Sequence, residues 1–97
     1  MYAVIFTARI NELDDEYSLM AKKMRSLAIE KYGCIGFNAV SEGGQEIAIS
    51  YWPSLKHIER WKNDPEHIKA QAVGRKHWYT EYKVQVAKIE REYEKHT

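Results

Sequence analysis

The sequence predicts an α+β protein of the ferredoxin-like class, with the element order βαββαβ and one antiparallel four-stranded sheet. Three observations predict this fold. Four segments are rich in β-branched and aromatic residues, which favours strands. Helical periodicity follows the first and the third of these segments. A short turn with two glycines separates the second segment from the third, which is typical of an antiparallel hairpin.

The first strand is expected over residues 2–9, which contain no Gly or Pro and are apolar on both alternating faces until near the end. Both faces are therefore expected to be covered. Asn11 is expected to cap the helix that follows, with Asp14 and Asp15 in its first turn. Apolar residues then recur at steps of three and four before Gly33, namely Tyr17, Met20, Ala21, Met24, Leu27 and Ala28.

The second and third strands are expected over residues 35–40 and 46–52, joined by a turn at 41–44 whose glycines can adopt positive φ. The fourth strand is expected over residues 82–93, and residues 93–97 are expected to form a polar tail. This last strand is long for a small domain and leaves an unpaired edge. Pairing with a second subunit would cover that edge.

Two helical segments are expected between the third and fourth strands. Ser54 is a good N-cap for the first segment, whose apolar face carries Leu55, Ile58 and Trp61. Asp64 caps the second segment and Pro65 begins it. One face of this second segment mixes polar and apolar residues and is expected to be only partly core: His67, Gln71, Gly74 and Trp78.

Residues 1–97 are expected to form a single domain, because no linker or low-complexity segment interrupts them. The predicted helices can cover only one face of the sheet, although its strands are apolar on both faces. A second copy of the chain would cover the other face. The sequence therefore predicts a homodimer.

The charges nearly balance, with 15 Lys and Arg against 14 Asp and Glu and a net charge of +1. Nucleic acids and membrane surfaces attract strongly basic proteins, so neither is expected as the principal partner. The single Cys34 cannot form an intrachain disulfide, and no signal peptide or long apolar run is evident. We therefore expect a cytoplasmic protein in which Cys34 is a buried, unreactive thiol.

The chain also resembles a known family in the order and spacing of several short elements. These are Ile47-Ala48-Ile49-Ser50-Tyr51-Trp52 with Ser54, then Trp61, Pro65-Glu66-His67 and Gln71, then Gly74-Arg75 and Trp78-Tyr79. In them the sequence is similar to the antibiotic biosynthesis monooxygenase (ABM) family of dimeric α+β barrels. The resemblance implies a homodimer whose two sheets form an α/β barrel, with a ligand cavity in each subunit between sheet and helices.

Members of the family include cofactor-independent oxygenases of aromatic quinol-type substrates, haem-degrading oxygenases and proteins of unassigned activity. The resemblance therefore indicates the scaffold more than the chemistry. The haem-degrading branch has an Asn on the first strand and a His ten residues after the helix Trp. Trp61 matches that Trp, but Thr7 and Gln71 stand at the other two positions. With no HxH or HExxH spacing either, we expect neither cofactor nor metal.

The candidate catalytic residues are Trp61, His67 and Gln71. Trp61 either belongs to the core or forms a wall of the ligand site. His67 is either a surface residue or a group that donates a hydrogen bond to a phenolate or accepts a proton near neutral pH. The amide of a buried Gln71 needs partners, which a ligand carbonyl or the backbone can supply.

The candidate substrate-binding residues are Thr7, Asn38, Ser50 and Tyr51. The first three are polar positions on otherwise apolar strands, which either line a cavity or pair across the sheet. Tyr51 would supply an aromatic wall.

The favoured function is cofactor-independent monooxygenation of a small aromatic or quinol-type molecule. Such a substrate, once deprotonated, can itself reduce oxygen in a dry pocket that stabilises the anion. The first alternative is a non-enzymatic dimeric protein that binds a small molecule or is associated with stress. The second alternative is a protein that binds haem, with or without degrading it.

Overall fold

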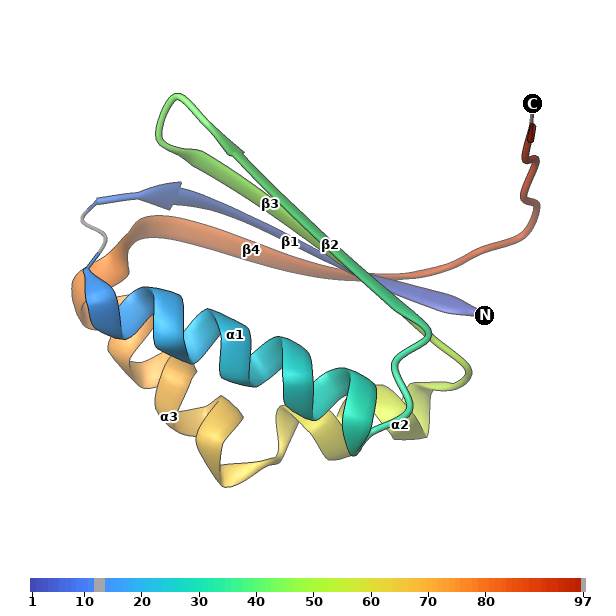
Figure 1. The fold of residues 1–97 in the computed structure, drawn as a ribbon, viewed down its shortest axis with the longest axis horizontal. Coiled ribbons are helices and arrows are strands. Elements are labelled where there is room, and N and C mark those ends of the chain that lie inside the picture. Colours follow the sequence, from blue (N-terminus) through green and yellow to red (C-terminus); the bar gives the residue numbers. More distant parts are fainter. Residues whose placement is uncertain (12–13, 97) are drawn as a thin grey trace.

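In a computed structural model that describes residues 1–11 and 14–96, the chain forms an antiparallel four-stranded sheet with its helices on one side (Figure 1). The elements are β1 (Tyr2–Ile10), α1 (Asp15–Glu30), β2 (Gly36–Glu42), β3 (Gln45–Trp52), α2 (Leu55–Lys62), α3 (Pro65–Val73), the π-helical turn η1 (Gly74–Trp78) and β4 (Tyr79–Lys88). The strand order is β2-β3-β1-β4. This arrangement confirms the predicted ferredoxin-like fold, including the interruption between α2 and α3.

The prediction that Asn11 caps the first helix is wrong, because Asp14 does so. The Asp14 side chain accepts a hydrogen bond from the amide of Tyr17 at 2.8 Å. Asn11 is engaged elsewhere, since its amide donates to the carbonyl of Trp78 at 2.8 Å. Residues 12 and 13, within the expected start of the helix, lie outside the described residues.

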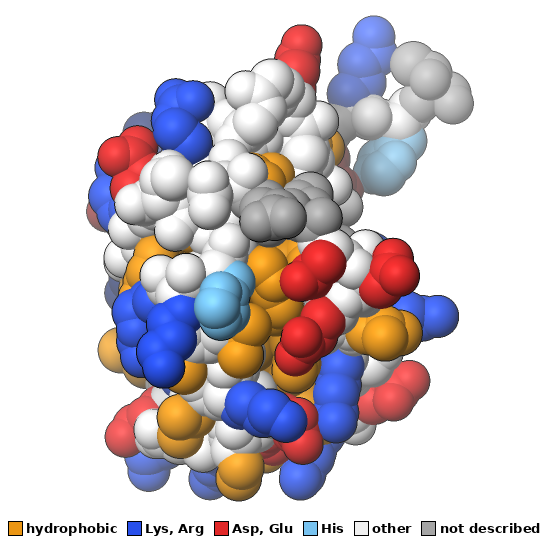
Figure 2. Space-filling model, turned by 90° about the vertical axis from the view of Figure 1, so that its left-hand side faces the viewer, with side chains coloured by type: hydrophobic (Ala, Val, Ile, Leu, Met, Phe, Trp, Pro, Cys, Tyr) orange, Lys and Arg blue, Asp and Glu red, His pale blue; other side chains and the backbone are white. Residues whose placement is uncertain are grey.

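Figure 2 shows the molecule from the side at which α1 begins, where hydrophobic side chains reach the surface between basic and acidic ones.

The fourth strand differs from the predicted range 82–93 at both ends. It begins earlier because Tyr79 pairs with Ile10, the last residue of β1. It ends earlier because Tyr2, the first residue of β1, pairs with Lys88. The length of β4 is therefore set by its neighbour β1 and not by its own alternating pattern.

The segment after β4 runs away from the sheet (Figure 1). Its first amide, that of Ile89, still donates to the carbonyl of Met1 at 3.0 Å. The predicted polar tail over residues 93–97 is exposed as far as residue 96, and residue 97 lies outside the described residues. None of the helices in the described part of the chain is long and apolar enough to cross a membrane.

The predicted caps of α2 and α3 are confirmed, and so is the predicted hairpin turn, although β2 extends to Glu42 and leaves only Gly43 and Gly44 in the turn. Gly43 and Gly44 join β2 to β3 with φ angles of +58° and +80°, the conformation of a tight hairpin turn. The Ser54 side chain accepts a hydrogen bond from the amide three residues later at 3.4 Å. The Asp64 side chain accepts one from the amide two residues later at 2.8 Å, with Pro65 at the first position of α3.

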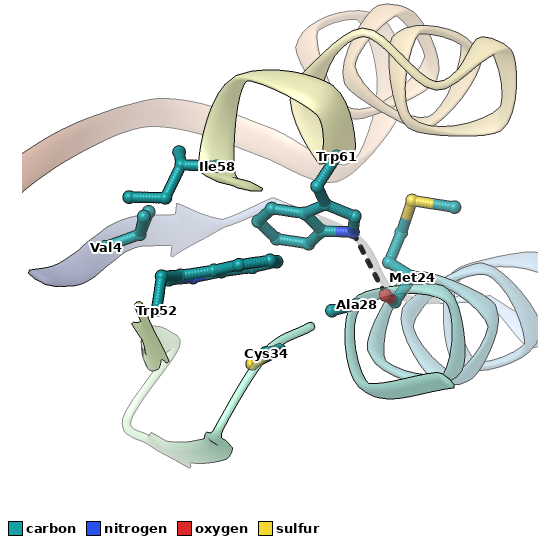
Figure 3. Close-up of a cluster of buried hydrophobic side chains, with 7 residues drawn as sticks. All are labelled: Val4, Met24, Ala28, Cys34, Trp52, Ile58 and Trp61. Atoms are coloured by element: carbon teal, nitrogen blue, oxygen red, sulfur yellow. Dashed lines mark hydrogen bonds between the residues drawn. The ribbon is translucent and has the colours of Figure 1, made fainter. Parts of the chain in front are cut away.

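The core lies between the sheet and the helices and centres on two tryptophans (Figure 3). Trp52 of β3 is fully buried, and its ring centroid is 5.0 Å from that of Trp61 of α2. The Trp61 Nε1–H donates to the carbonyl of Met24 at 3.3 Å, which joins α2 to α1. The cluster consists of Val4, Met24, Ala28, Cys34, Trp52, Ile58 and Trp61.

The Cys34 thiol is buried in this core, as predicted. Its Sγ–H donates to the carbonyl of Gly36 at 3.1 Å. Burial raises the pKa of the Cys34 thiol, which keeps it protonated. Cys34 therefore acts as a packing residue.

The strand register divides the sheet into two faces, because directly opposed residues point to the same side. The face toward the helices carries Val4, Phe6 and Ala8 of β1. We call the other side the open face, since no helix of the described chain covers it. It carries Ala3, Ile5, Thr7 and Arg9 of β1, Gly36, Asn38, Val40 and Glu42 of β2, Gln45, Ile47, Ile49 and Tyr51 of β3, and Glu81, Lys83, Gln85 and Ala87 of β4.

Replacing Gly44 by Ala is expected to destabilise the protein by about 1–2 kcal/mol, because a Cβ is strained at positive φ. Gly36→Ala is the matched control. Gly36 is not among the glycines with positive φ, and an added Cβ would meet Tyr51 at 3.6 Å, an ordinary contact. Urea unfolding of both variants measures the difference, and equal free energies of unfolding would contradict the assigned turn conformation.

Candidate functional site

A cavity of about 340 Å³ lies between the helix-facing side of the sheet and the helices. This volume falls within the range of small-molecule sites. All four strands, the three α-helices and η1 contribute side chains to its wall, and most of these are hydrophobic or aromatic. The cavity is therefore suited to an apolar ligand with a few polar contacts.

Aromatic rings gather at two places along this cavity. In the first, which we call the Trp61 group, Trp61 contacts Trp52, Phe37 and His67, with ring centroids 5.0, 6.2 and 4.4 Å away. The second, which we call the Tyr79 group, consists of Phe6, Tyr17, Trp78, Tyr79 and Tyr82, with neighbouring centroids 5.2 to 6.5 Å apart.

The two groups lie at different depths along β1. Val4 packs in the cluster that contains Trp61, whereas Phe6 contacts Tyr79 and Ala8 pairs with Glu46. The four residue steps from Val4 to Ala8 span about 13 Å. The cavity is thus elongated, with the Trp61 group at one end and Glu46 with the Tyr79 group at the other.

His67 lines the cavity beside Trp61. Its ring stands edge-on to the indole, at an interplanar angle of 76°. Its Nδ1 is shielded from solvent and has no hydrogen-bond partner within the described residues. Burial lowers the pKa of His67 below its ordinary value, and the positive charge of Lys62 lowers it further. The imidazole is therefore neutral near pH 7 and can exchange a proton with a ligand.

All three candidate catalytic residues line the same cavity. Gln71 lies one helical turn after His67 on α3, and Trp61 closes the end of α2. Within the described residues, no group of three or more His, Cys, Asp or Glu side chains is arranged to hold a metal ion.

The four candidate substrate-binding residues lie elsewhere. Thr7, Asn38 and Tyr51 are on the open face of the sheet, on the side away from the cavity. Ser50 faces the helices, but it is buried and its Oγ accepts a hydrogen bond from Trp52 Nε1 at 2.8 Å. None of the four is among the residues that form the cavity wall.

Sequence reasoning missed a polar group at the far end of the cavity. Glu46 of β3 is only 9% exposed and lines the cavity wall. The Tyr17 hydroxyl donates to its Oε1, and the Tyr79 hydroxyl donates to its Oε2 at 3.3 Å. One signal in the sequence could have found it. Glu46 alternates with Ala48 and Ser50 on the inward side of a strand, where an acid is rare.

Burial is the main cause that raises the pKa of both Tyr17 and Tyr79 well above the ordinary value, and the neighbouring Glu46 raises each further. Both phenols therefore stay protonated and act as hydrogen-bond donors. Asp14 positions this end of the site, because its Oδ1 accepts hydrogen bonds from the Tyr17 amide at 2.8 Å and from Trp78 Nε1 at 3.2 Å.

Gly74 lets Tyr79 lie close to the helical turn that precedes it. A Cβ at this position would stand 3.0 Å from Cε2 of Tyr79 and 3.2 Å from its Cδ2. Both distances are shorter than an ordinary van der Waals contact. The absence of a side chain at Gly74 therefore fixes how near this ring lies to η1.

Comparison with known proteins gives a relative with no assigned function and a more distant monooxygenase. No family model matches the chain. The uncharacterized protein YqjZ of Bacillus subtilis is 41% identical over 92 residues, which cover 94% of this chain and 81% of that protein. A jasmonate monooxygenase ABM of Pyricularia oryzae is 29% identical over 93 residues. The match covers 92% of this chain but only 43% of that protein.

Solved structures share the fold at low sequence identity. SnoaB, a cofactor-independent oxygenase from Streptomyces nogalater, superposes with a TM-score of 0.78 at 10% identity, covering 94% of each chain. A second structure, described as an antibiotic biosynthesis monooxygenase, gives a TM-score of 0.77 at 13% identity, covering 92% of this chain and 98% of the other.

The lowered pKa of His67 predicts that stability falls on the acid side of neutrality. Below about pH 6.5 the unfolded chain binds a proton at this residue while the folded protein resists it, so the free energy of unfolding decreases as the pH falls. His67→Gln is expected to flatten this decrease between about pH 7 and pH 5. The carboxyl of Asp64 does not interfere, because its pKa is lowered from 3.8 by the hydrogen bond from Tyr32.

Urea unfolding at several pH values measures this slope. His77→Gln, which removes an exposed histidine of η1, is the control and should leave the slope unchanged. An unaltered slope in His67→Gln would contradict the lowered pKa of the partly buried imidazole.

Proposed function

The chain belongs to the same family as YqjZ of Bacillus subtilis and has the fold of antibiotic biosynthesis monooxygenases, and from this premise we propose that it is a cofactor-independent monooxygenase of a small aromatic, quinol-type substrate. The observation that carries the proposal is a partly buried His67, neutral near pH 7, held against Trp61 in the wall of an apolar cavity. A base and a dry aromatic pocket are what this chemistry requires of the protein.

The reaction needs no external reductant when the substrate supplies the electrons. In a substrate with a methylene carbon, such as an anthrone, one oxygen atom of O₂ enters as a carbonyl and the other leaves as water, which takes the two hydrogens lost from that carbon. The four electrons that reduce O₂ come from that carbon. Deprotonation starts the sequence, because the anion of an electron-rich ring is a far better electron donor than the neutral molecule.

The three candidate catalytic residues each have a role in this proposal. His67 accepts the proton from the substrate, since its imidazole is neutral near pH 7. Trp61 forms the wall against which the substrate ring packs, and the Gln71 amide donates a hydrogen bond to the resulting oxyanion. Trp61 and Gln71 also bear on the haem alternative, because the cavity presents an amide where the haem-degrading branch has an imidazole.

We propose further that the protein is a cytoplasmic homodimer joined through the open face. Ile47 is 36% exposed and Val40 67% exposed on this face, and Ile5 and Ile49 lie opposite one another at its centre. Two such sheets pack face to face at about 10 Å and exclude water from both. Thr7, Asn38 and Tyr51 would then lie in the interface and not in the substrate site.

Oxygen uptake with a dihydroxynaphthalene or an anthrone tests the enzymatic proposal. His67→Ala is expected to lower kcat by at least about 100-fold, the usual effect of losing a general base. Trp61→Phe should act mainly on KM, because it keeps an aromatic wall. His77→Ala, at an exposed site on η1, is the control.

Equal oxygen uptake with and without the protein would instead favour a non-enzymatic binding protein. Adding haem and recording its Soret band tests the remaining alternative, for which a shifted band is required.

Sedimentation tests the homodimer. The wild type is expected to sediment as a dimer at micromolar concentration and Ile49→Asp as a monomer, because the substitution places a charge at the centre of the open face. Leu19→Asp, at a position of α1 that is 71% exposed, should remain dimeric. If the wild type sediments as a compact monomer at this concentration, the proposed dimer interface is wrong.

A further inference from the structure

We propose that Glu46, held by Tyr17 and Tyr79, forms a subsite that accepts a hydrogen bond from a hydroxyl group of the ligand. The cavity would then select aromatic molecules that carry a hydroxyl at this end. The inference rests on the proposed function only in taking the cavity as the substrate site. It does not depend on the oxygen chemistry.

The first support is the unusual placement of the acid. A carboxylate is costly to bury unless it is hydrogen-bonded, and Glu46 lies between the sheet and the helices with two phenol donors, one on each oxygen. Each carboxylate oxygen can accept about two hydrogen bonds. The tyrosines therefore hold the group in position and leave acceptor capacity for a ligand in the cavity that Glu46 lines.

The second support is the chemistry around the carboxylate. Tyr17 and Tyr79 remain protonated, so their hydroxyls point their hydrogens at Glu46 and do not compete as bases. The surrounding rings are apolar, which makes a hydrogen bond to the carboxylate stronger than it would be in water. A ligand hydroxyl is thus the group that gains most at this end.

The charges that line the cavity narrow the ligand class. Lys22, Arg25 and Lys62 also line it, from α1 and α2, and they make the cavity as a whole less favourable for a cationic amine. Lys22 and Arg25 are exposed, so an anionic group of a ligand would meet them on the helix side. A neutral hydroxyl group can donate a hydrogen bond to Glu46 on the sheet and brings no positive charge toward the basic side chains on the helices.

Glu46 and His67 lie at opposite ends of the cavity, so their effects on ligand binding can be tested independently. Glu46 pairs with Ala8 of β1, whereas His67 contacts Trp61, whose core cluster includes Val4. Val4 and Ala8 are about 13 Å apart along the strand. A preference for a hydroxyl group that arises at Glu46 must therefore survive the loss of His67.

A matched pair of ligands tests the subsite. Equilibrium dialysis without oxygen compares 1-naphthol with 1-methoxynaphthalene, which has the same ring system and no hydroxyl hydrogen. The wild type is expected to bind 1-naphthol about tenfold more tightly, the effect of one hydrogen bond to a charged acceptor. In Glu46→Gln the ratio should fall to near one, because the charge is lost and the amide can donate to either oxygen.

Two controls share the ligand pair. Glu42→Gln makes the same chemical change at an exposed position of the same hairpin, and His67→Ala removes the polar group of the other end. Both should keep the tenfold ratio. If Glu46→Gln does not fold, Glu46→Asp withdraws the carboxylate by one methylene and is expected to lower the ratio in the same direction.

Three results would overturn the subsite: equal binding of the two ligands by the wild type, an unchanged ratio in the Glu46 variants, or no binding of either ligand at millimolar concentration. The outcomes distinguish the two proposals. Oxygen uptake that fails while the naphthol preference persists removes the oxygenase and leaves the subsite. Turnover with no naphthol preference removes the subsite alone.

Discussion

The indole of Trp61 makes the contact on which the rest of the arrangement depends. Its ring packs on the fully buried Trp52, its Nε1–H bonds to the backbone of α1, and its edge meets His67. One side chain thus joins the sheet, α1 and the α2–α3 unit. The part of the Trp61 ring that does not pack on Trp52 lines the cavity. Core packing and ligand wall, which the sequence left as alternatives for Trp61, are two sides of the same ring.

The opposite end of the cavity is fixed by polar contacts. Asp14 caps α1 and also accepts from Trp78, while the backbone of Asn11 bonds to the carbonyl of the same tryptophan. These bonds hold the start of α1 against the start of β4, so that Tyr17 and Tyr79 converge on Glu46. Contacts therefore hold the helices against the sheet at the Trp61 group and at the Tyr79 group. The cavity lies between these two groups.

The sequence predicted correctly those features that depend only on residues close together in the chain. The Gly43-Gly44 turn, the Ser54 and Asp64 caps and the face shared by His67 and Gln71 are all of this kind. What escaped prediction depends on distant partners. Asn11 and Asp14 are both good caps, but the amide of Asn11 donates to the carbonyl of Trp78, and the helix begins only after Asp14. The extent of β4 follows from the extent of β1.

The face on which each strand residue lies was harder to predict. Because the strands are apolar on both sides, alternation alone did not tell Thr7 and Asn38 from positions that face the helices. Glu46 was missed for the same reason, since its place on the buried side follows from its pairing with Ala8 of β1.

Gly74 affects the width of the cavity because it lies against Tyr79, which forms part of the cavity wall. Since a single methyl group there would press on the phenol of Tyr79, the breadth of the chamber beside Glu46 is set by a hydrogen atom. A relative with alanine or serine at this place would have to shift the ring by a few tenths of an ångström. Such a substitution would reshape the cavity beside Glu46 without changing any residue that lines it.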